Sequence, residues 1–207
     1  EFTRNGESTV SFSGQVTRLS QSDELYGALN DPSDFETLDA MFNGVDGSSA
    51  GFSNDDLNGT SKIIGSKTSA STLQGSAVDR QAFNDMITEY TSEVVPNFDL
   101  PYDANANVAG VYPGTSYRLN AAGQEIDQLF FKGLIGAFTL DQIVNNYLHP
   151  NQLDSGDNVA NNDNDVLDGD SNYTKMEHKW DEGFGYLYGH LDDMGMGEDL
   201  TTAGSSP

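Results

Sequence analysis

The residues best suited to chemistry lie on one stretch near the end of the chain. His178 and Glu182 are four positions apart, so in a helix they share a face, and Glu177 and Asp181 form a second pair beside them at the same spacing. An imidazole with several carboxylates and no sulfur suits iron, zinc or manganese. The pattern therefore indicates part of a metal site. The alternative is a surface and capping cluster in which Glu177 complements the helix macrodipole.

A complete metal site needs ligands from a second helix. Glu125 and Asp127 lie on the helix expected at 123–148, the longest apolar segment of the chain, and either is a candidate if a bundle brings the two helices together. In the capping alternative, the helix is held by apolar side chains that fill the core, namely Trp180, Phe184 and Leu187.

An acidic loop offers a second kind of site. Asp163, Asp165, Asp168 and Asp170 lie in a segment that also has many Asn residues, and clustered carboxylate and carbonyl oxygens can form a flexible calcium site. The run does not fit an EF-hand, because counting from Asp163 puts Leu167 at a ligand position and Asp168 where the loop requires glycine. An irregular calcium site and a solvated acidic loop are both open interpretations.

The composition narrows the classes of partner. Nine Lys and Arg stand against 33 Asp and Glu, which gives a formal charge of -24. Such a charge argues against nucleic acid and anionic membrane as partners and favours cations, although it is also typical of a protein kept soluble in salty surroundings. There is no cysteine, so any metal site must use oxygen and imidazole.

Signals for catalysis are weak. The chain has no Gly-x-Ser-x-Gly, no His-Glu-x-x-His, no phosphate-binding loop of the Walker type and no dinucleotide fingerprint. We therefore favour a protein that is not an enzyme. No run of 18 apolar residues is present, so no transmembrane segment is predicted.

Helices must position these residues, and apolar residues at helical spacing predict five of them, at 18–29, 34–42, 76–95, 123–148 and 174–190. Thr174 is the expected cap of the last. The segment 123–148 is apolar around much of its circumference and is expected inside a bundle, with Gly133 and Gly136 as packing devices. An extended N-terminal arm is predicted at 8–13.

Polar, glycine-rich segments separate the helices. We expect long loops at 43–75 and 151–172, with at most one short turn of helix in the first, and a tail at 192–207. The fold class predicted is mainly α, a helical bundle with long irregular loops in a single domain over 1–207.

Three stretches together resemble a known family. They are 2–15, 133–148 and 172–186, which include Gly133-Leu-Ile-Gly-Ala137 and Tyr173-Thr-Lys-Met-Glu-His-Lys-Trp-Asp-Glu182. They resemble the domain of unknown function 4856 family, mainly Bacteroidetes-type lipoproteins that look similar to imelysin-like, peptidase M75-type helical proteins. Imelysin-like proteins carry a helix-borne His-x-x-Glu motif, whereas here Asp181 takes the third place after His178 and Glu182 follows.

The resemblance implies an imelysin-like bundle that is secreted or lies at the cell surface or in the periplasm, with a lipid anchor on the precursor. It also implies that the chain is the N-terminal part of a longer protein, either a fragment or a processed product.

The first functional hypothesis is a non-enzymatic cell-envelope protein that binds a metal ion, with iron favoured, or that assists an outer-membrane receptor in iron acquisition. The alternative is a structural or assembly protein whose acidic loops bind calcium and which packs on another protein chain, its own C-terminal half included. A hydrolase of the peptidase type rests on the imelysin resemblance alone.

Overall fold

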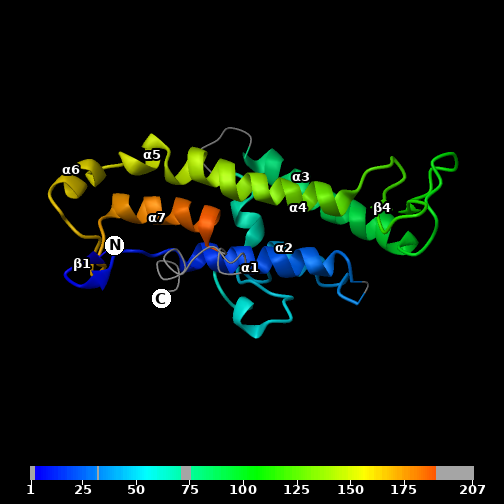
Figure 1. Ribbon diagram of the computed structural model, residues 1–207, viewed down its shortest axis with the longest axis horizontal. Helices are drawn as coiled ribbons and strands as arrows, with labels where there is room; N and C mark the ends of the chain where they lie inside the picture. The colour runs from blue at the N-terminus through cyan, green and yellow to red at the C-terminus, as the bar shows by residue number, and fades with distance from the viewer. Residues whose placement is uncertain (1–2, 32, 71–75, 190–207) are drawn as a thin grey trace. The chain divides into compact units, whose positions relative to one another are not determined.

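The computed structural model describes residues 3–31, 33–70 and 76–189 (Figure 1). Over these ranges the chain is mainly α-helical, with strands of only two residues, so the predicted fold class is confirmed. The chain forms two compact units. Unit 1 comprises Glu1–Leu19, Ser69–Ser76 and Gly136–Pro207, and unit 2 comprises Ser20–Thr68 and Ala77–Ile135.

Unit 1 carries the stretch with the histidine and carboxylates. Its elements are β1 (Thr3–Arg4), β2 (Glu7–Ser8), the first part of α1 (Ser13–Ala28), η5 (Ala137–Tyr147), α5 (Pro150–Leu153), α6 (Asn158–Asp163) and α7 (Lys175–Tyr188). The helix η5 is of the wider π type. Helix α7, orange in Figure 1, packs along the yellow-green η5.

The N-terminal arm is a short hairpin followed directly by helix. Thr3 pairs with Ser8 and Arg4 with Glu7, and the connecting Asn5 and Gly6 have φ of 55° and 85°. Asn-Gly favours this two-residue turn because both positions require positive φ. Only Ser8 of the predicted extended segment 8–13 lies in a strand.

Helix α1 begins at Ser13, five residues before the predicted start at Arg18. Apolar periodicity misses its first turns because Gln15 and Arg18, both polar, are the buried residues there.

Aromatic residues build the core of unit 1. Phe138 and Tyr186 stack with ring centroids 4.9 Å apart, and Phe12 and Tyr147 are buried with them. A Cβ on Gly185 would lie 2.5 Å from Cβ of Phe12, just before α1, and 3.0 Å from Cβ of Gln15 on α1, so α7 approaches this segment too closely for any larger residue.

Two residues that were predicted to lie on the buried face of α7 are exposed instead. Trp180 is 57% exposed and Leu187 51% exposed, while Gly183, Gly185 and Tyr186 are buried. Because glycines form much of this packed face, apolar periodicity points to the opposite side of the helix.

The segment 123–148 was expected inside a bundle, but four of its large apolar side chains are exposed. Leu129, Ile135, Leu140 and Val144 are between 47% and 64% exposed. Apolar atoms supply more than half of the surface of most folded proteins, so an apolar composition overstates burial.

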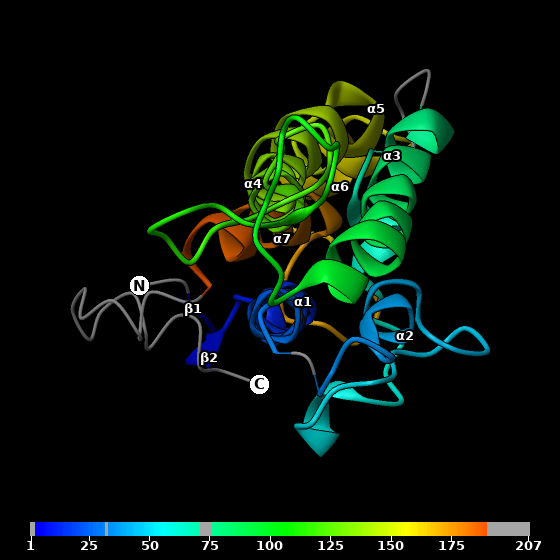
Figure 2. The same cartoon turned by 90° about the vertical axis from the view of Figure 1, so that its right-hand side faces the viewer.

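Unit 2 consists of the rest of α1 and the following elements: α2 (Leu38–Asn43), η1 (Asp55–Leu57), η2 (Ile64–Lys67), α3 (Ser76–Glu89), η3 (Tyr90–Val94), η4 (Val95–Asn97), β3 (Gly110–Val111), β4 (Arg118–Leu119) and α4 (Ile126–Gly136). Figures 1 and 2 both show α3 and α4 side by side.

Three phenylalanines join the helices of unit 2. Phe42 of α2, Phe83 of α3 and Phe130 of α4 pack with ring centroids 5.4 to 6.1 Å apart. A Cβ on Gly133 would lie 3.1 Å from the Phe83 ring, so Gly133 permits close packing of α4 on α3, as predicted. A Cβ on Gly136 would meet nothing within 4 Å, so Gly136 has no such role.

The polar segments contain more structure than the sequence predicts. Residues 43–70 include η1 and η2, and Asn58 holds the chain by accepting from Phe52 N at 3.0 Å and donating to Phe52 O at 2.8 Å. Within 151–172 lie most of α5 and all of α6. The predicted tail at 192–207 falls outside the described residues, as do 71–75.

None of the described helices combines the length and the apolar character needed to cross a membrane.

Candidate functional site

The start of α7 is fixed by a capping box at Thr174, the residue predicted to cap this helix. The Thr174 hydroxyl accepts from Glu177 N at 3.2 Å, and the Glu177 carboxylate accepts from Thr174 N at 2.7 Å. Thr174 is buried, and its hydroxyl also donates to Oδ1 of Asn162 at 2.8 Å. These bonds satisfy amide groups that the first turn leaves free and set which way the following side chains face.

Glu177 is bound to the N-terminal hairpin. Arg4 donates from Nη1 and Nη2 to its two carboxylate oxygens at 2.9 and 3.0 Å. The hydrogen bond with Arg4 lowers the pKa of Glu177 and outweighs the opposite effect of burial. Glu177 therefore serves the capping role of the structural alternative, and in addition it anchors a strand.

Asp181 lies on the side of α7 that meets the N-terminal arm. Its Oδ2 accepts from Ser11 N at 3.0 Å. Burial raises the pKa of Asp181 to about 7, and the nearby negative charges of Glu177 and Glu182 act in the same direction. Asp181 therefore changes its charge near neutral pH.

His178 and Glu182 lie on one face of α7, as their spacing indicates. The distance between Nε2 of His178 and Oε2 of Glu182 is 4.0 Å, and both side chains are partly buried. The His178 ring stacks on Tyr173, with centroids 4.7 Å apart and planes 12° from parallel, which restricts its orientation.

Glu182 also has a lysine partner. Lys179 Nζ lies 2.5 Å from Oε2 of Glu182, and Gln15 Nε2 lies 3.4 Å from Oε1. Gln15 reaches the hydroxyl of Tyr147 as well, at 3.4 Å. Burial, with a further contribution from the charge of Glu182, raises the pKa of Tyr147 to about 12.

Neither Lys179 nor Gln15 was predicted from the sequence as a residue of the candidate site. The spacing of three between Lys179 and Glu182 is a local signal that could have identified the lysine. Nothing local marks Gln15, because it reaches Glu182 from a different helix.

The predicted ligands belong to two different units of the chain. Four of them, Glu177, His178, Asp181 and Glu182, lie in unit 1, whereas Glu125 belongs to unit 2, where it lines a cavity with Asp127. Over residues 3–31, 33–70 and 76–189, no three His, Asp or Glu side chains form a group that could hold a metal ion. His178 and Glu182 are therefore the pair from which a metal site would have to be built.

The acidic loop is partly used by an ion pair. Asp165, with φ of 54°, pairs with Nη2 of Arg4 at 3.1 Å. Asp163 ends α6, while Asp168 and Asp170 are exposed. Arg4 thus links this loop to α7, and the calcium site remains a prediction.

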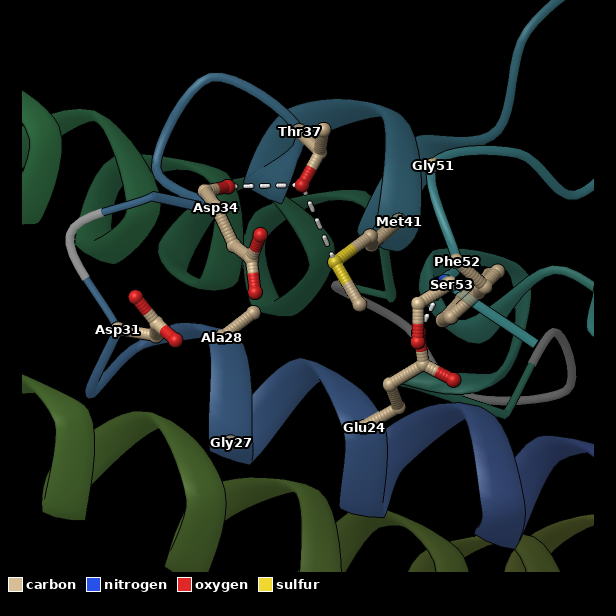
Figure 3. A pocket seen from close by; sticks show the side chains of 10 residues that line it. All are labelled: Glu24, Gly27, Ala28, Asp31, Asp34, Thr37, Met41, Gly51, Phe52 and Ser53. Atoms are coloured by element: carbon tan, nitrogen blue, oxygen red, sulfur yellow. Dashed lines mark hydrogen bonds between the residues drawn. The ribbon is translucent and has the colours of Figure 1, made fainter.

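A cavity of about 440 Å³ in unit 2 is lined by three carboxylates (Figure 3). Glu24 comes from α1, and Asp31 and Asp34 come from the turn before α2. Glu24 accepts from the backbone amides of Ser53 and Asn54, and hydrogen bonds from Ser33 lower the pKa of Asp31. These acids have no regular spacing, so no sequence pattern groups them.

Fold and site together define a mainly α-helical protein whose candidate site lies on a single capped helix. The family model described as Domain of unknown function (DUF4856) matches residues 1–198, and the chain belongs to this family. The resemblance seen in the sequence is thereby confirmed at the level of the family. No curated protein and no solved structure matches the chain.

Proposed function

We propose that this chain is a non-enzymatic protein of the cell envelope that binds a metal ion through His178 and Glu182. The observation that supports it best is the 4.0 Å distance between Nε2 of His178 and Oε2 of Glu182 on one face of α7. Two donors that each lie about 2.0 to 2.2 Å from a shared ion can be separated by up to roughly this distance. Imidazole with carboxylate suits iron, zinc and manganese.

Iron is the favoured ion, and iron acquisition, alone or with an outer-membrane receptor, is the proposed process. The support for both is the resemblance of α7 and its neighbourhood to imelysin-like proteins. That resemblance also supports placing the protein at the cell surface or in the periplasm.

Lys179 competes with a metal ion for Glu182, which gives a test specific to this site. Its ammonium group now neutralises Glu182 at 2.5 Å, so an ion that used the same oxygen would have to displace it. A metal cation and an ammonium group compete for one carboxylate. Removal of the lysine charge should therefore strengthen metal binding.

The test is calorimetric titration of metal-free protein with iron(II), zinc(II) and manganese(II), supported by the fluorescence of Trp180, the single tryptophan of the chain. We expect one ion per chain, loss of binding in His178→Ala and in Glu182→Gln, and several-fold tighter binding in Lys179→Met. His149→Ala is the matched control, because His149 caps α5 and accepts from Asn151 N. Absence of binding by the unaltered protein, or equal binding by His178→Ala, would contradict the proposal.

A further inference from the structure

A second cavity, of about 300 Å³, lies in unit 2 near the start of α4. Its wall includes Tyr26 of α1, Arg118 of β4, and Glu125, Asp127 and Lys132 at and along α4. The volume is at the lower end of the range for sites that bind small molecules. It has no part in the function proposed for α7.

The most unusual group in this wall is the Asp127 carboxylate. Asp127 is only 6% exposed, and its Oδ1 is buried without a hydrogen-bond partner among the described residues. The other oxygen, Oδ2, accepts from Gln128 Nε2 at 3.3 Å. A buried carboxylate oxygen that lacks a donor is costly, so such atoms usually have a partner from protein, water or ligand.

Several donors around the cavity are directed to other acceptors. Gln128 Nε2 donates to the hydroxyl of Tyr26 at 2.6 Å as well as to Asp127. The hydroxyl of Tyr90 donates to the carbonyl of Leu29.

Arg118 is similarly occupied. Its Nε donates to Phe98 O at 3.0 Å, its Nη1 donates to Ser116 O at 3.3 Å, and the guanidinium lies 3.5 Å from the centroid of the Phe98 ring. Two of its five N–H groups and one face of the guanidinium are thus used within the protein.

Glu125 adds a second acid to the same wall. Burial raises the pKa of Glu125, and the neighbouring charge of Asp127 acts in the same direction, while Lys132 opposes both. The cavity thus presents two carboxyl groups, an oxygen in need of an N–H donor and the aromatic ring of Tyr26.

We propose that this cavity binds a small organic molecule through a primary ammonium group. The ammonium donates a charge-assisted hydrogen bond to Oδ1 of Asp127, Glu125 adds negative charge, and Tyr26 contacts the alkyl part. A metal ion fits less well, because the described residues offer no group of three acidic or histidine ligands. Lys132 can face a second group on the ligand, which is neutral or anionic.

The experiment is ligand-observed NMR with the whole chain, using 1,4-diaminobutane and 4-aminobutyrate as probes. We expect saturation transfer to one or both, and none to 1,4-butanediol or to tetramethylammonium, which have no ammonium N–H. Tighter binding of 4-aminobutyrate than of the diamine would show that Lys132 pairs with an anionic end. The reverse order would contradict the placement of Lys132 opposite a neutral or anionic group of the ligand.

Asp127→Asn should weaken binding about tenfold or more, since a hydrogen bond between charged groups is lost. Asp85→Asn, an exposed change on α3 in the same unit, should leave it unchanged. If Asp127→Asn does not fold, Glu125→Gln provides the second test and should weaken binding several-fold. Equal signals from the diol, no signal from either amine at about 10 mM, or unchanged affinity in a folded Asp127→Asn variant would each overturn the proposal.

Discussion

At the scale of single residues, the charges on α7 are set by contacts with distant parts of the chain. Arg4 keeps Glu177 ionised, whereas burial against the N-terminal arm favours the neutral form of Asp181. Lys179 compensates Glu182. Three carboxylates within two turns therefore have three different electrostatic environments.

The raised pKa of Asp181 predicts a pH dependence of stability. A carboxyl group with a higher pKa in the folded state binds its proton more tightly when folded. Its penalty on folding is therefore absent well below pH 4 and grows as the pH rises from about 3.8 to about 7. Above pH 7 the penalty is complete.

Asp181→Asn should remove this penalty while keeping an acceptor for Ser11 N. We expect the variant to be more stable than the parent at pH 8 by about 1 to 2 kcal/mol, allowing for partial exposure, and to differ less at pH 4.5. Urea unfolding at both pH values, in the presence of a chelator, measures the difference. Parallel behaviour of the two proteins across this range would show that Asp181 is not the group responsible.

At the scale of elements, the two glycines of the long helix test how its packing works. Glycine inside a helix costs about 1 kcal/mol relative to alanine. Gly136→Ala should gain part of this, because its Cβ would meet nothing within 4 Å. Gly133→Ala should lose stability, because its Cβ would lie 3.1 Å from the Phe83 ring, which is held between Phe42 and Phe130.

Thermal unfolding of the two alanine variants measures this contrast directly. An equal gain in both would mean that the contact between α4 and α3 yields easily, and that Gly133 is not a packing device.

The helices also show which features of the fold could be predicted from the sequence. The predicted start of α7 was correct because the residues that cap it are close in the sequence, with Thr174 and Glu177 three positions apart. The prediction of the buried face of α7 was wrong because Gly183 and Gly185 form much of that face, and glycine contributes nothing to apolar periodicity. The start of α1 was missed because its buried residue Gln15 is polar.

The site was predictable only in part, for a related reason. Spacing along one helix gave the shared face of His178 and Glu182. The partner of Glu177, by contrast, lies 173 positions earlier in the chain at Arg4, and the cavity at Asp127 combines residues from four separate segments. Such long-range pairs follow from tertiary packing, which periodicity does not report.

At the scale of the whole molecule, the charge of -24 predicts a dependence of stability on salt. Self-repulsion destabilises a compact chain, and at 0.1 M salt exposed charges are screened beyond about 10 Å. The midpoint of thermal unfolding should therefore rise by several degrees between about 10 mM and 500 mM sodium chloride.

Choline chloride at the same ionic strength is the control and should give a comparable rise. About 1 mM calcium at constant ionic strength should add nothing if screening is the whole effect. A large additional rise with calcium would instead favour a calcium site in the loop of Asp163 to Asp170.

If His178 and Glu182 together hold a metal ion, X-ray absorption of protein loaded with one equivalent of iron or zinc will detect both ligands. The metal should have nitrogen and oxygen neighbours at about 2.0 to 2.2 Å and the outer scattering of one imidazole, which disappears in His178→Ala. A first shell of oxygen alone in the unaltered protein, or an imidazole signal that persists in His178→Ala, would contradict it.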